Sequence, residues 1–439
     1  MGIAALSVTL GFFLPAITMQ PAPTTPPPTA PAQNRPAAPP PPPITEDQKR
    51  EVLEGMEKLL FESAFVPGVD FREKWPEFLE KHKEGMEKAD TIPAFTTAVN
   101  RALREFGFSH IRLQTPTAVQ ARNNVVRVGI GVTAENRDER LAVTAVAPKG
   151  PADLAGIRPG ETIITIDGEP AKPDRLLGEM GREVKLGVQS PTGETREVTV
   201  RYGRFISATP EVLTWPAPDT AMIRVRTFSG GFNTELINSY FKEVHDKKAK
   251  NLILDLRSNG GGSTANLAHL MSFFVPANDV IGTFVNRRTA DQFAKETGKE
   301  PTDLMEMAEW ARSKYRVRKG PLPPFEGRIV VLINRGSASA SEITAQALRE
   351  HREAVIIGLP TAGAVLASQF RPLPHGFNLQ VPVSDYVSLK GVRLERNPVR
   401  PDHEVAAGRP NEPDPQLAKA LEVLGVAPVE EPEDKFFWL

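Results

Sequence analysis

The chain has 439 residues, of which 40% are hydrophobic, so it is long enough for two or three domains with their own cores. Its formal net charge of −1 gives no electrostatic case for a nucleic-acid partner. It has no cysteine, which excludes disulfides and thiolate chemistry.

The first 43 residues predict an exported protein. Residues 1–20 are apolar and uncharged, as in the hydrophobic part of a secretory signal or in a short membrane anchor interrupted by Pro15. They lack a basic start and a clean small-x-small cleavage site. Residues 21–43 form a Pro-rich linker that is too poor in bulky apolar side chains to fold. We therefore expect a periplasmic, cell-envelope or extracellular location, with a membrane tether as the alternative to cleavage.

Residues 44–124 predict an N-terminal helical region. Thr45-Glu46-Asp47 is suited to open the first helix, and amphipathic patterns follow at 75–86 and 92–106. The region ends in a Ser109-His110 pair, just before a short apolar stretch.

Residues 125–204 are rich in strand patterns. A strand is expected from Val128 to Val132 and another at 142–146, and the pair Asp167-Gly168 is typical of a tight hairpin. This succession of strands and turns closely resembles a PDZ domain. The resemblance implies that a peptide C-terminus binds as an added strand, held on the loop by Val128, Gly129, Ile130, Gly131 and Val132. The alternative is that the domain serves only as a scaffold.

Residues 205–427 predict an α/β body. A buried strand at 251–256 runs into the glycine-rich turn 257–263 and then into a helix. No P-loop lysine follows this turn, which argues against nucleotide binding. A polar, helix-prone insertion occupies 287–320, and residues 428–439 form a tail.

A serine-rich turn from Ser337 to Glu342 joins a predicted buried strand at 328–334 to a predicted helix. Small residues on such a turn let a substrate carbonyl approach closely, and the N–H groups at the helix start face developing negative charge. The alternative for a Ser/Ala-rich helix start is a simple cap. The glycine-rich turn offers further N–H groups, around Gly261, for an oxyanion.

Four segments in one order resemble the tail-specific, or carboxyl-terminal processing, serine protease family. They are the PDZ domain and the stretches Asp255–Gly262, Ser337–Glu342 and Gly358–Gly363. The resemblance runs through most of the chain from Val125 to Asp402 and implies Ser339 as the nucleophile. The lysine general base of the processing proteases would follow the last of these glycines, where this chain has Ala364. A serine without a base is a poor nucleophile at neutral pH.

The Ser109-His110 pair is similar to one in the tricorn-type branch of the same superfamily. That branch also has a glutamate in a stretch near the end, which the residues from Glu395 to Asp402 resemble. The resemblance implies that His110 takes the proton of the serine nucleophile and later delivers it to the leaving amine. It also implies that Ser109 and Glu395 orient and polarise His110.

The sequence thus predicts an exported serine endopeptidase with an α/β core, an inserted PDZ domain and an N-terminal helical region. It would act through an acyl-enzyme, with the backbone N–H groups of Gly261 and Ala340 as the oxyanion hole. Its partners would be proteins or peptides with unstructured C-termini, and a homo-oligomer is compatible with the sequence. No cofactor or metal is expected, because the histidines show no metal-ligand spacing.

Two alternatives remain open. The missing lysine is also compatible with a catalytically inactive protein that binds peptides or other ligands. A third interpretation keeps a lysine mechanism with a different residue, Lys390, as the base.

Overall fold

The computed structural model describes residues 41–123, 126–137, 140–147, 149–206, 211–408 and 412–429. The predicted signal or anchor segment, most of the Pro-rich linker and most of the tail lie outside these residues. None of the helices in these ranges is both long and apolar enough to cross a membrane.

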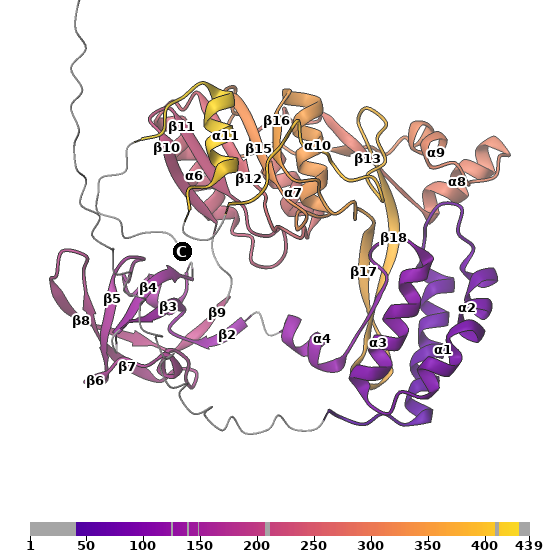
Figure 1. Ribbon diagram of the computed structural model, residues 1–439, viewed down its shortest axis with the longest axis horizontal. Coiled ribbons are helices and arrows are strands. Elements are labelled where there is room, and N and C mark those ends of the chain that lie inside the picture. Colours follow the sequence, from indigo (N-terminus) through magenta and orange to yellow (C-terminus); the bar gives the residue numbers. More distant parts are fainter. Residues whose placement is uncertain are drawn as a thin grey trace, which may run out of the picture. The chain divides into compact units, whose positions relative to one another are not determined.

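A mixed sheet forms the centre of the α/β body (Figure 1). Its order is β10-β11-β12-β15-β16-β19, and every pair except β10–β11 is parallel. The strands span Val212–Ala217 (β10), Thr220–Arg224 (β11), Asn251–Asp255 (β12), Arg328–Ile333 (β15), Val355–Gly358 (β16) and His403–Glu404 (β19). All five residues of β12 are buried, as expected for a central parallel strand.

Helices cover both faces of this sheet. Side chains alternate along each strand, so successive residues pack on opposite faces. Leu254 and Val331 belong to the core that includes residues of α6, α7 and α10. Ile253 and Leu332 belong to the core under α11 on the other face. These helices span Thr234–Asp246 (α6), Thr264–Met271 (α7), Ala340–Arg352 (α10) and Pro415–Leu424 (α11). The α/β class predicted from the sequence is confirmed.

A second, antiparallel sheet joins the N-terminal helical region to the body. It contains β1 (Arg112–Gln114), β13 (Val280–Asn286), β14 (Tyr315–Arg316), β17 (Ala367–Pro372) and β18 (Asn378–Ser388). Helices α1 (Glu46–Ser63), α2 (Phe71–Glu87) and α3 (Ile92–Leu103) lie beside β17 and β18 in Figure 1. Leu379 and Val381 of β18 share a core with Trp75 and Phe95 of these helices. The short strand β1, two residues after His110, pairs with β18.

The PDZ-like segment has its own core and a sheet in the order β3-β4-β5-β7-β8. Its elements span Val126–Gly129 (β2), Val132–Arg137 (β3), Arg140–Val146 (β4), Pro151–Leu154 (α5), Thr162–Ile166 (β5), Glu169–Pro170 (β6), Pro173–Leu176 (η2), Glu183–Gln189 (β7), Thr195–Arg201 (β8) and Gly203–Ile206 (β9). Asp167 and Gly168 both have positive φ, 53° and 80°, and join β5 to β6 as the predicted two-residue hairpin. The strand predicted from Val128 to Val132 is instead two strands. They break at Ile130-Gly131, where Gly131 has a φ of 81°.

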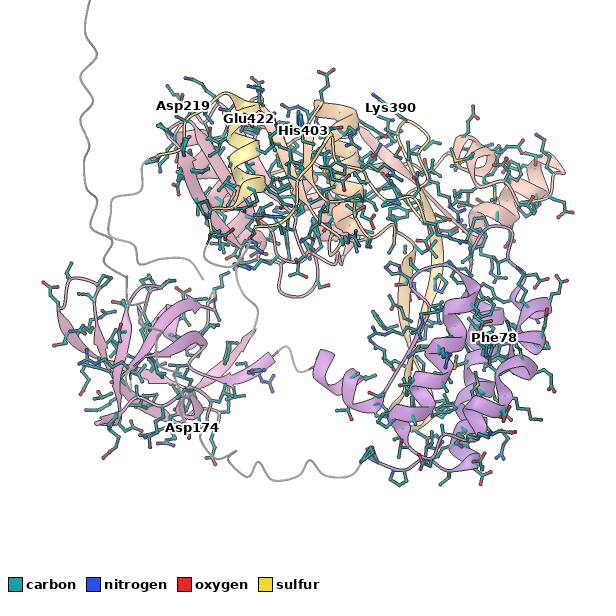
Figure 2. All side chains as sticks on the ribbon, in the orientation of Figure 1. Phe78, Asp174, Asp219, Lys390, His403 and Glu422 are labelled. Carbon is teal, nitrogen blue, oxygen red and sulfur yellow. The ribbon has the colours of Figure 1, made fainter. Side chains whose placement is uncertain are left out.

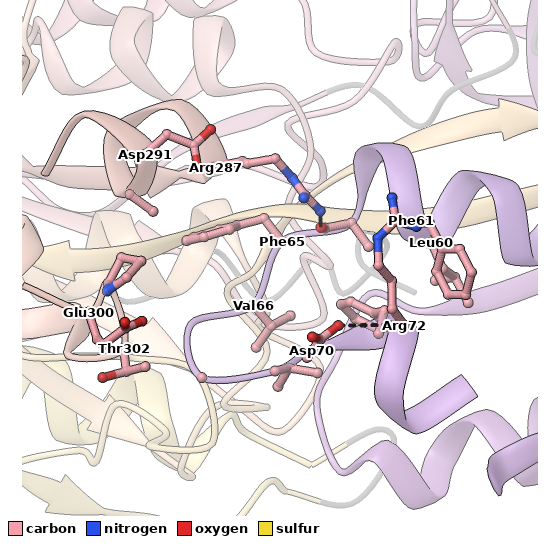
Figure 3. Close-up of a pocket in the computed structure, with 16 residues that line it drawn as sticks. Leu60, Phe61, Phe65, Val66, Asp70, Arg72, Arg287, Asp291, Glu300 and Thr302 are labelled. Atoms are coloured by element: carbon pink, nitrogen blue, oxygen red, sulfur yellow. Dashed lines mark hydrogen bonds between the residues drawn. The ribbon is translucent and has the colours of Figure 1, made fainter. Parts of the chain in front are cut away.

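The insertion at 287–320 contains α8 (Arg287–Thr297) and α9 (Leu304–Trp310). These helices pack against β13 and β18 and contact Phe65, which follows α1. A surface pocket of about 460 Å³ lies where the α1–α2 connection meets this insertion. Figure 3 shows Phe65, Val66 and Asp70 on one side of it and Asp291 and Glu300 on the other.

Candidate active site

The serine-rich turn connects β15 to α10 at the carboxyl end of the parallel sheet, where ligands bind in open α/β folds. Two of its three serines are buried and have structural roles. Ser337 Oγ donates a hydrogen bond to the Leu256 carbonyl at 2.8 Å, and Ser341 Oγ donates to the Asn259 carbonyl at 2.8 Å. Ser339, the serine in the middle, is partly exposed at the start of α10.

The backbone at Ser339 is strained. Its φ of 56° and ψ of −115° lie in a region that non-glycine residues rarely adopt, at a typical cost of about 1–3 kcal/mol. Strain of this kind persists only where the surroundings hold it in place, and it is concentrated at functional sites. Ser339 is thus held, partly exposed, on a sharp strand-to-helix turn.

The glycine-rich turn after β12 lies directly against Ser339. A Cβ atom built on Gly261 would be 2.7 Å from Ser339 Cβ and 2.9 Å from the Ala340 nitrogen. Only glycine fits at this separation, since real Cβ contacts are longer. The structure therefore brings Gly261, Ser339 and Ala340 together, as the sequence predicts.

The sequence predicts that the N–H group of Gly261 faces an oxyanion, but in the structure this N–H is engaged within its own turn. It donates to Asn259 Oδ1 at 3.0 Å, and the Asn259 amide nitrogen donates to the Val225 carbonyl at 2.9 Å. Gly261 thus shapes the turn beside Ser339 while its hydrogen is held within the glycine-rich turn. The N–H of Ala340, at the first position of α10, is not satisfied within the helix, since the first four N–H groups of a helix have no partner inside it.

A second cluster forms around His110. Ser109 Oγ lies 2.5 Å from His110 Nδ1 and 2.8 Å from Glu395 Oε2. A carboxylate can only accept, so the Ser109 hydroxyl donates to Glu395 and accepts from Nδ1–H. The Nε2 atom of neutral His110 then carries the lone pair that a general base needs.

Glu395 is held by four hydrogen bonds from three backbone N–H groups and one hydroxyl. Besides Ser109 Oγ, the donors are Ser109 N (2.6 Å), Val365 N (2.9 Å) and Leu366 N (3.3 Å). The residue is 3% exposed. The nearby Arg393 pairs with Asp385 instead.

The electrostatics of His110 favour the neutral imidazole. Burial lowers its pKa below the ordinary value, and the negative charge of Glu395 opposes this shift only in part. His110 also has a positive φ of 60°, so the pair Ser109-His110 forms a bend rather than a strand.

The two clusters meet at the loop from Thr361 to Leu366. Ala364, at the position of the family lysine, supplies only a backbone N–H, which donates to Glu342 Oε2 at 2.9 Å. The next two N–H groups, of Val365 and Leu366, donate to Glu395. No hydrogen bond joins His110 to Ser339 in the described part of the chain.

Lys390 lies far from the nucleophile turn. Figure 2 shows it on the turn after β18, and its backbone N–H donates to Glu350 Oε2. Glu350 is eleven positions after Ser339, so at 1.5 Å per residue it lies roughly 16 Å along α10. The structure gives no support for Lys390 as the base.

The predicted peptide-binding loop of the PDZ-like segment contacts a segment of the same chain. The Ile130 N–H donates to the Leu176 carbonyl at 3.0 Å, Gly178 N donates to the Val128 carbonyl at 3.3 Å, and Gly129 forms a bridge with Leu177. An added peptide strand would use the same kind of bonds. These contacts were not apparent in the sequence, since residues 176–178 carry no strand pattern.

Comparison with known proteins gives matches over both parts of the chain. Residues 219–405 match peptidase family S41, and residues 142–201 match a PDZ domain. The chloroplastic carboxyl-terminal-processing peptidase 3 of Arabidopsis thaliana is 24% identical over 373 residues, which are 80% of this chain and 67% of that protein. The carboxyl-terminal-processing protease of Picosynechococcus sp. is 28% identical over 315 residues, 68% of this chain and 70% of that protein.

A solved structure, of the tricorn protease, shares the fold with a TM-score of 0.53 at 17% identity, and covers 86% of this chain and 36% of that chain. The matched regions cover 67%, 53% and 60% of three curated relatives, so this chain spans about one half to two thirds of their length. The family matches agree with the serine turn, the facing glycine-rich turn and the PDZ-like core described above. Residues 219–405 thus belong to the serine peptidases of family S41, together with the carboxyl-terminal processing proteases, and residues 142–201 belong to the PDZ domains.

Proposed function

We propose that this protein is a serine endopeptidase in which Ser339 is the nucleophile and His110 the general base. The observation that carries the proposal is the chain of hydrogen bonds from Glu395 through Ser109 to His110 Nδ1. It sets the tautomer that leaves Nε2 free to accept a proton. A protein that only bound peptides would have no use for this arrangement.

The reaction follows from these positions. His110 Nε2 takes the proton of Ser339 Oγ as the oxygen attacks the scissile carbonyl carbon, and the N–H of Ala340 stabilises the oxyanion. The imidazolium then protonates the leaving amine, which departs with its half of the substrate. Water hydrolyses the acyl-enzyme by the same steps, with His110 again as base, and restores the Ser339 hydroxyl.

Active-site labelling tests this proposal. The full chain is treated with a fluorophosphonate probe as wild type and as the variants Ser339→Ala and His110→Ala. His375→Ala is the control, because His375 is an exposed histidine paired with Glu51. We expect labelling of the wild type and the control only, with all four proteins folded. A folded wild type that is not labelled would instead favour the binding pseudoprotease.

The PDZ domain would capture unstructured peptide C-termini on the loop from Val128 to Val132. Because the Ile130 N–H is engaged by the Leu176 carbonyl, binding would displace residues 176–178. Gly178→Ala provides the test, since a Cβ there would lie 2.4 Å from the Tyr202 ring and push the segment away. We expect peptide affinity, measured by titration with a fluorescent peptide that has an apolar C-terminus, to rise about tenfold. Equal or lower affinity would favour the scaffold role.

Export is the remaining part of the proposal. It rests on the apolar, uncharged residues 1–20 and the Pro-rich linker that follows. Cell fractionation, with sequencing of the N-terminus of the recovered protein, distinguishes cleaved, tethered and retained forms.

A further inference from the structure

Glu342 is a fully buried carboxylate whose two oxygens accept four hydrogen bonds. Oε1 accepts from Thr361 Oγ1 (2.5 Å) and Gly363 N (2.8 Å), and Oε2 accepts from Ser339 N (3.0 Å) and Ala364 N (2.9 Å). Burial raises its pKa, and all four of these bonds act in the opposite direction. The side chain therefore joins the backbone of the nucleophile to a loop about twenty residues further along the chain.

This arrangement goes beyond helix capping. A glutamate at the third position of a helix commonly accepts from the N-cap N–H, and the bond to Ser339 N is of that kind. The other three donors come from the loop at Thr361, Gly363 and Ala364, which a capping residue does not need.

The loop itself is fixed at successive residues. Ala362 N donates to the Ser337 carbonyl at 3.0 Å, and the Gly363 carbonyl accepts from Arg396 N at 2.8 Å. Thr361 Oγ1 also accepts from Val399 N at 2.8 Å. The loop thus contacts both the nucleophile turn and the stretch that contains Glu395.

Four consecutive N–H groups of the loop divide between two carboxylates. Those of Gly363 and Ala364 donate to Glu342, and those of Val365 and Leu366 donate to Glu395. One carboxylate holds the backbone of the nucleophile, and the other holds the Ser109 hydroxyl that contacts His110. The separation of the two carboxylates is therefore set by a short run of rigid backbone.

We infer that Glu342 is a positioning residue that fixes the nucleophile turn and the Thr361–Leu366 loop as one unit, and through Glu395 keeps His110 in register with Ser339. The loop that would carry a lysine base in the processing proteases serves here as a backbone bridge. This inference rests on the proposed function, because the register matters only if His110 acts on Ser339.

The first test measures fluorophosphonate labelling of the full chain as a function of probe concentration. Glu342→Gln leaves one acceptor oxygen for four donors, and Thr361→Val removes a single hydroxyl without changing the side-chain shape. We expect the maximal labelling rate to fall about 10²-fold in Glu342→Gln and about tenfold in Thr361→Val, with little change in the probe concentration for half-maximal rate. Thr361→Ser, which keeps the hydroxyl, should restore the rate.

Glu350→Gln is the matched control. Glu350 lies on the same helix and accepts hydrogen bonds from Gln346, Ser388 and the Lys390 backbone, away from the loop. The Glu350→Gln variant should be labelled at the wild-type rate even if its melting temperature falls. Equal loss of rate in Glu350→Gln and Glu342→Gln, or a wild-type rate in Thr361→Val, would overturn the inference. If Glu342→Gln does not fold, the comparison of Thr361→Val with Thr361→Ser decides.

The second test does not depend on activity. The pKa of His110 is followed by NMR in the full chain labelled at histidine Cε1, with His110→Ala assigning the signal. Thr361→Val should move this pKa upward, towards the ordinary value, because water enters when the loop loosens and burial is the main cause of the lowered pKa. An unchanged pKa would overturn the inference even if the wild type proves unable to cleave. An unlabelled wild type with the pKa shift would reject the proposed function alone.

Discussion

The Ser109 hydroxyl donates a hydrogen bond to Glu395 Oε2 at 2.8 Å across 286 residues of sequence. Ser109 Oγ also lies 2.5 Å from His110 Nδ1, so the hydroxyl links the buried carboxylate to the imidazole. The carboxylate and the histidine are thus connected through Ser109, the residue before His110, rather than by a direct contact.

Removal of this hydroxyl should impair the base. Ser109→Ala leaves His110 Nδ1 without its partner and removes one of the three donors to Glu395 Oε2, so the imidazole loses its fixed tautomer and orientation. We expect the fluorophosphonate labelling rate to fall about 10²-fold, within the usual range for loss of general-base catalysis. Ser109→Thr keeps the hydroxyl and should retain most of the rate. Equal rates for Ser109→Ala and the wild type would exclude the relay.

The pH dependence should report His110. Its pKa is lowered by burial, and only the neutral imidazole can accept the Ser339 proton. The labelling rate should therefore rise with pH, reach half its maximum below the ordinary histidine value of about 6.5, and stay level above it. A pH series between 4.5 and 9 measures this. A rate that rises only towards about pH 9–10 would indicate a lysine instead.

Gly261 should be intolerant of any side chain. A Cβ there would lie 2.7 Å from the Ala338 carbonyl oxygen and 2.7 Å from Ser339 Cβ, so Gly261→Ala must shift the nucleophile turn. We expect at least a roughly 10²-fold loss of labelling rate, because small displacements of reacting groups are costly.

Gly260→Ala is the control for this substitution. A Cβ on Gly260 meets no atom within 4 Å, so the variant should keep the wild-type rate. Loss of rate in both variants would show that flexibility of the whole glycine-rich turn, rather than space at Gly261, is what matters.

A stability measurement addresses Glu211, a buried carboxyl at the start of the α/β body. It is 1% exposed, and burial raises its pKa to about 7 from 4.5. The unfolded state therefore ionises at lower pH than the folded state, and stability falls as pH rises from about 4.5 through 7. Glu211→Gln should gain melting temperature at pH 8, corresponding to at most about 3 kcal/mol, and gain little at pH 5.

Glu235→Gln serves as the comparison, because Glu235 forms an exposed ion pair with Lys149. Its effect should be small at both pH values. A pH-independent gain in Glu211→Gln would mean that the pKa of Glu211 is the same in the folded and unfolded states.

The local structure around the nucleophile could be predicted from the sequence. A β-branched run followed by small residues and a helical pattern identified β15, the turn and α10. The hairpin at Asp167-Gly168 was equally clear, because both residues tolerate the positive φ that its turn requires. These features depend on neighbours within a few residues.

Features that depend on distant contacts could not be predicted. The spacing from Ser339 to Glu342 fits a capping box, but nothing in it reveals the bonds to Thr361, Gly363 and Ala364. The partner of the Gly261 N–H also depends on a side-chain orientation in the folded turn. At the break at Ile130-Gly131, the Ile130 N–H donates to the distant Leu176 carbonyl, a contact that a two-residue alternation does not encode.

The pairing of β1 with β18 has a consequence for biosynthesis. His110 lies just before β1, whereas β18 and Glu395 are among the last parts of the body to leave the ribosome. A nascent chain would therefore hold its histidine without the carboxylate that contacts Ser109, and the proposed base for Ser339 would not be complete until the whole body has emerged. Closing so long a loop is a late event in folding. The order of the segments along the chain would thus delay proteolytic activity until the enzyme itself has folded and is no longer an unfolded substrate for its own active site.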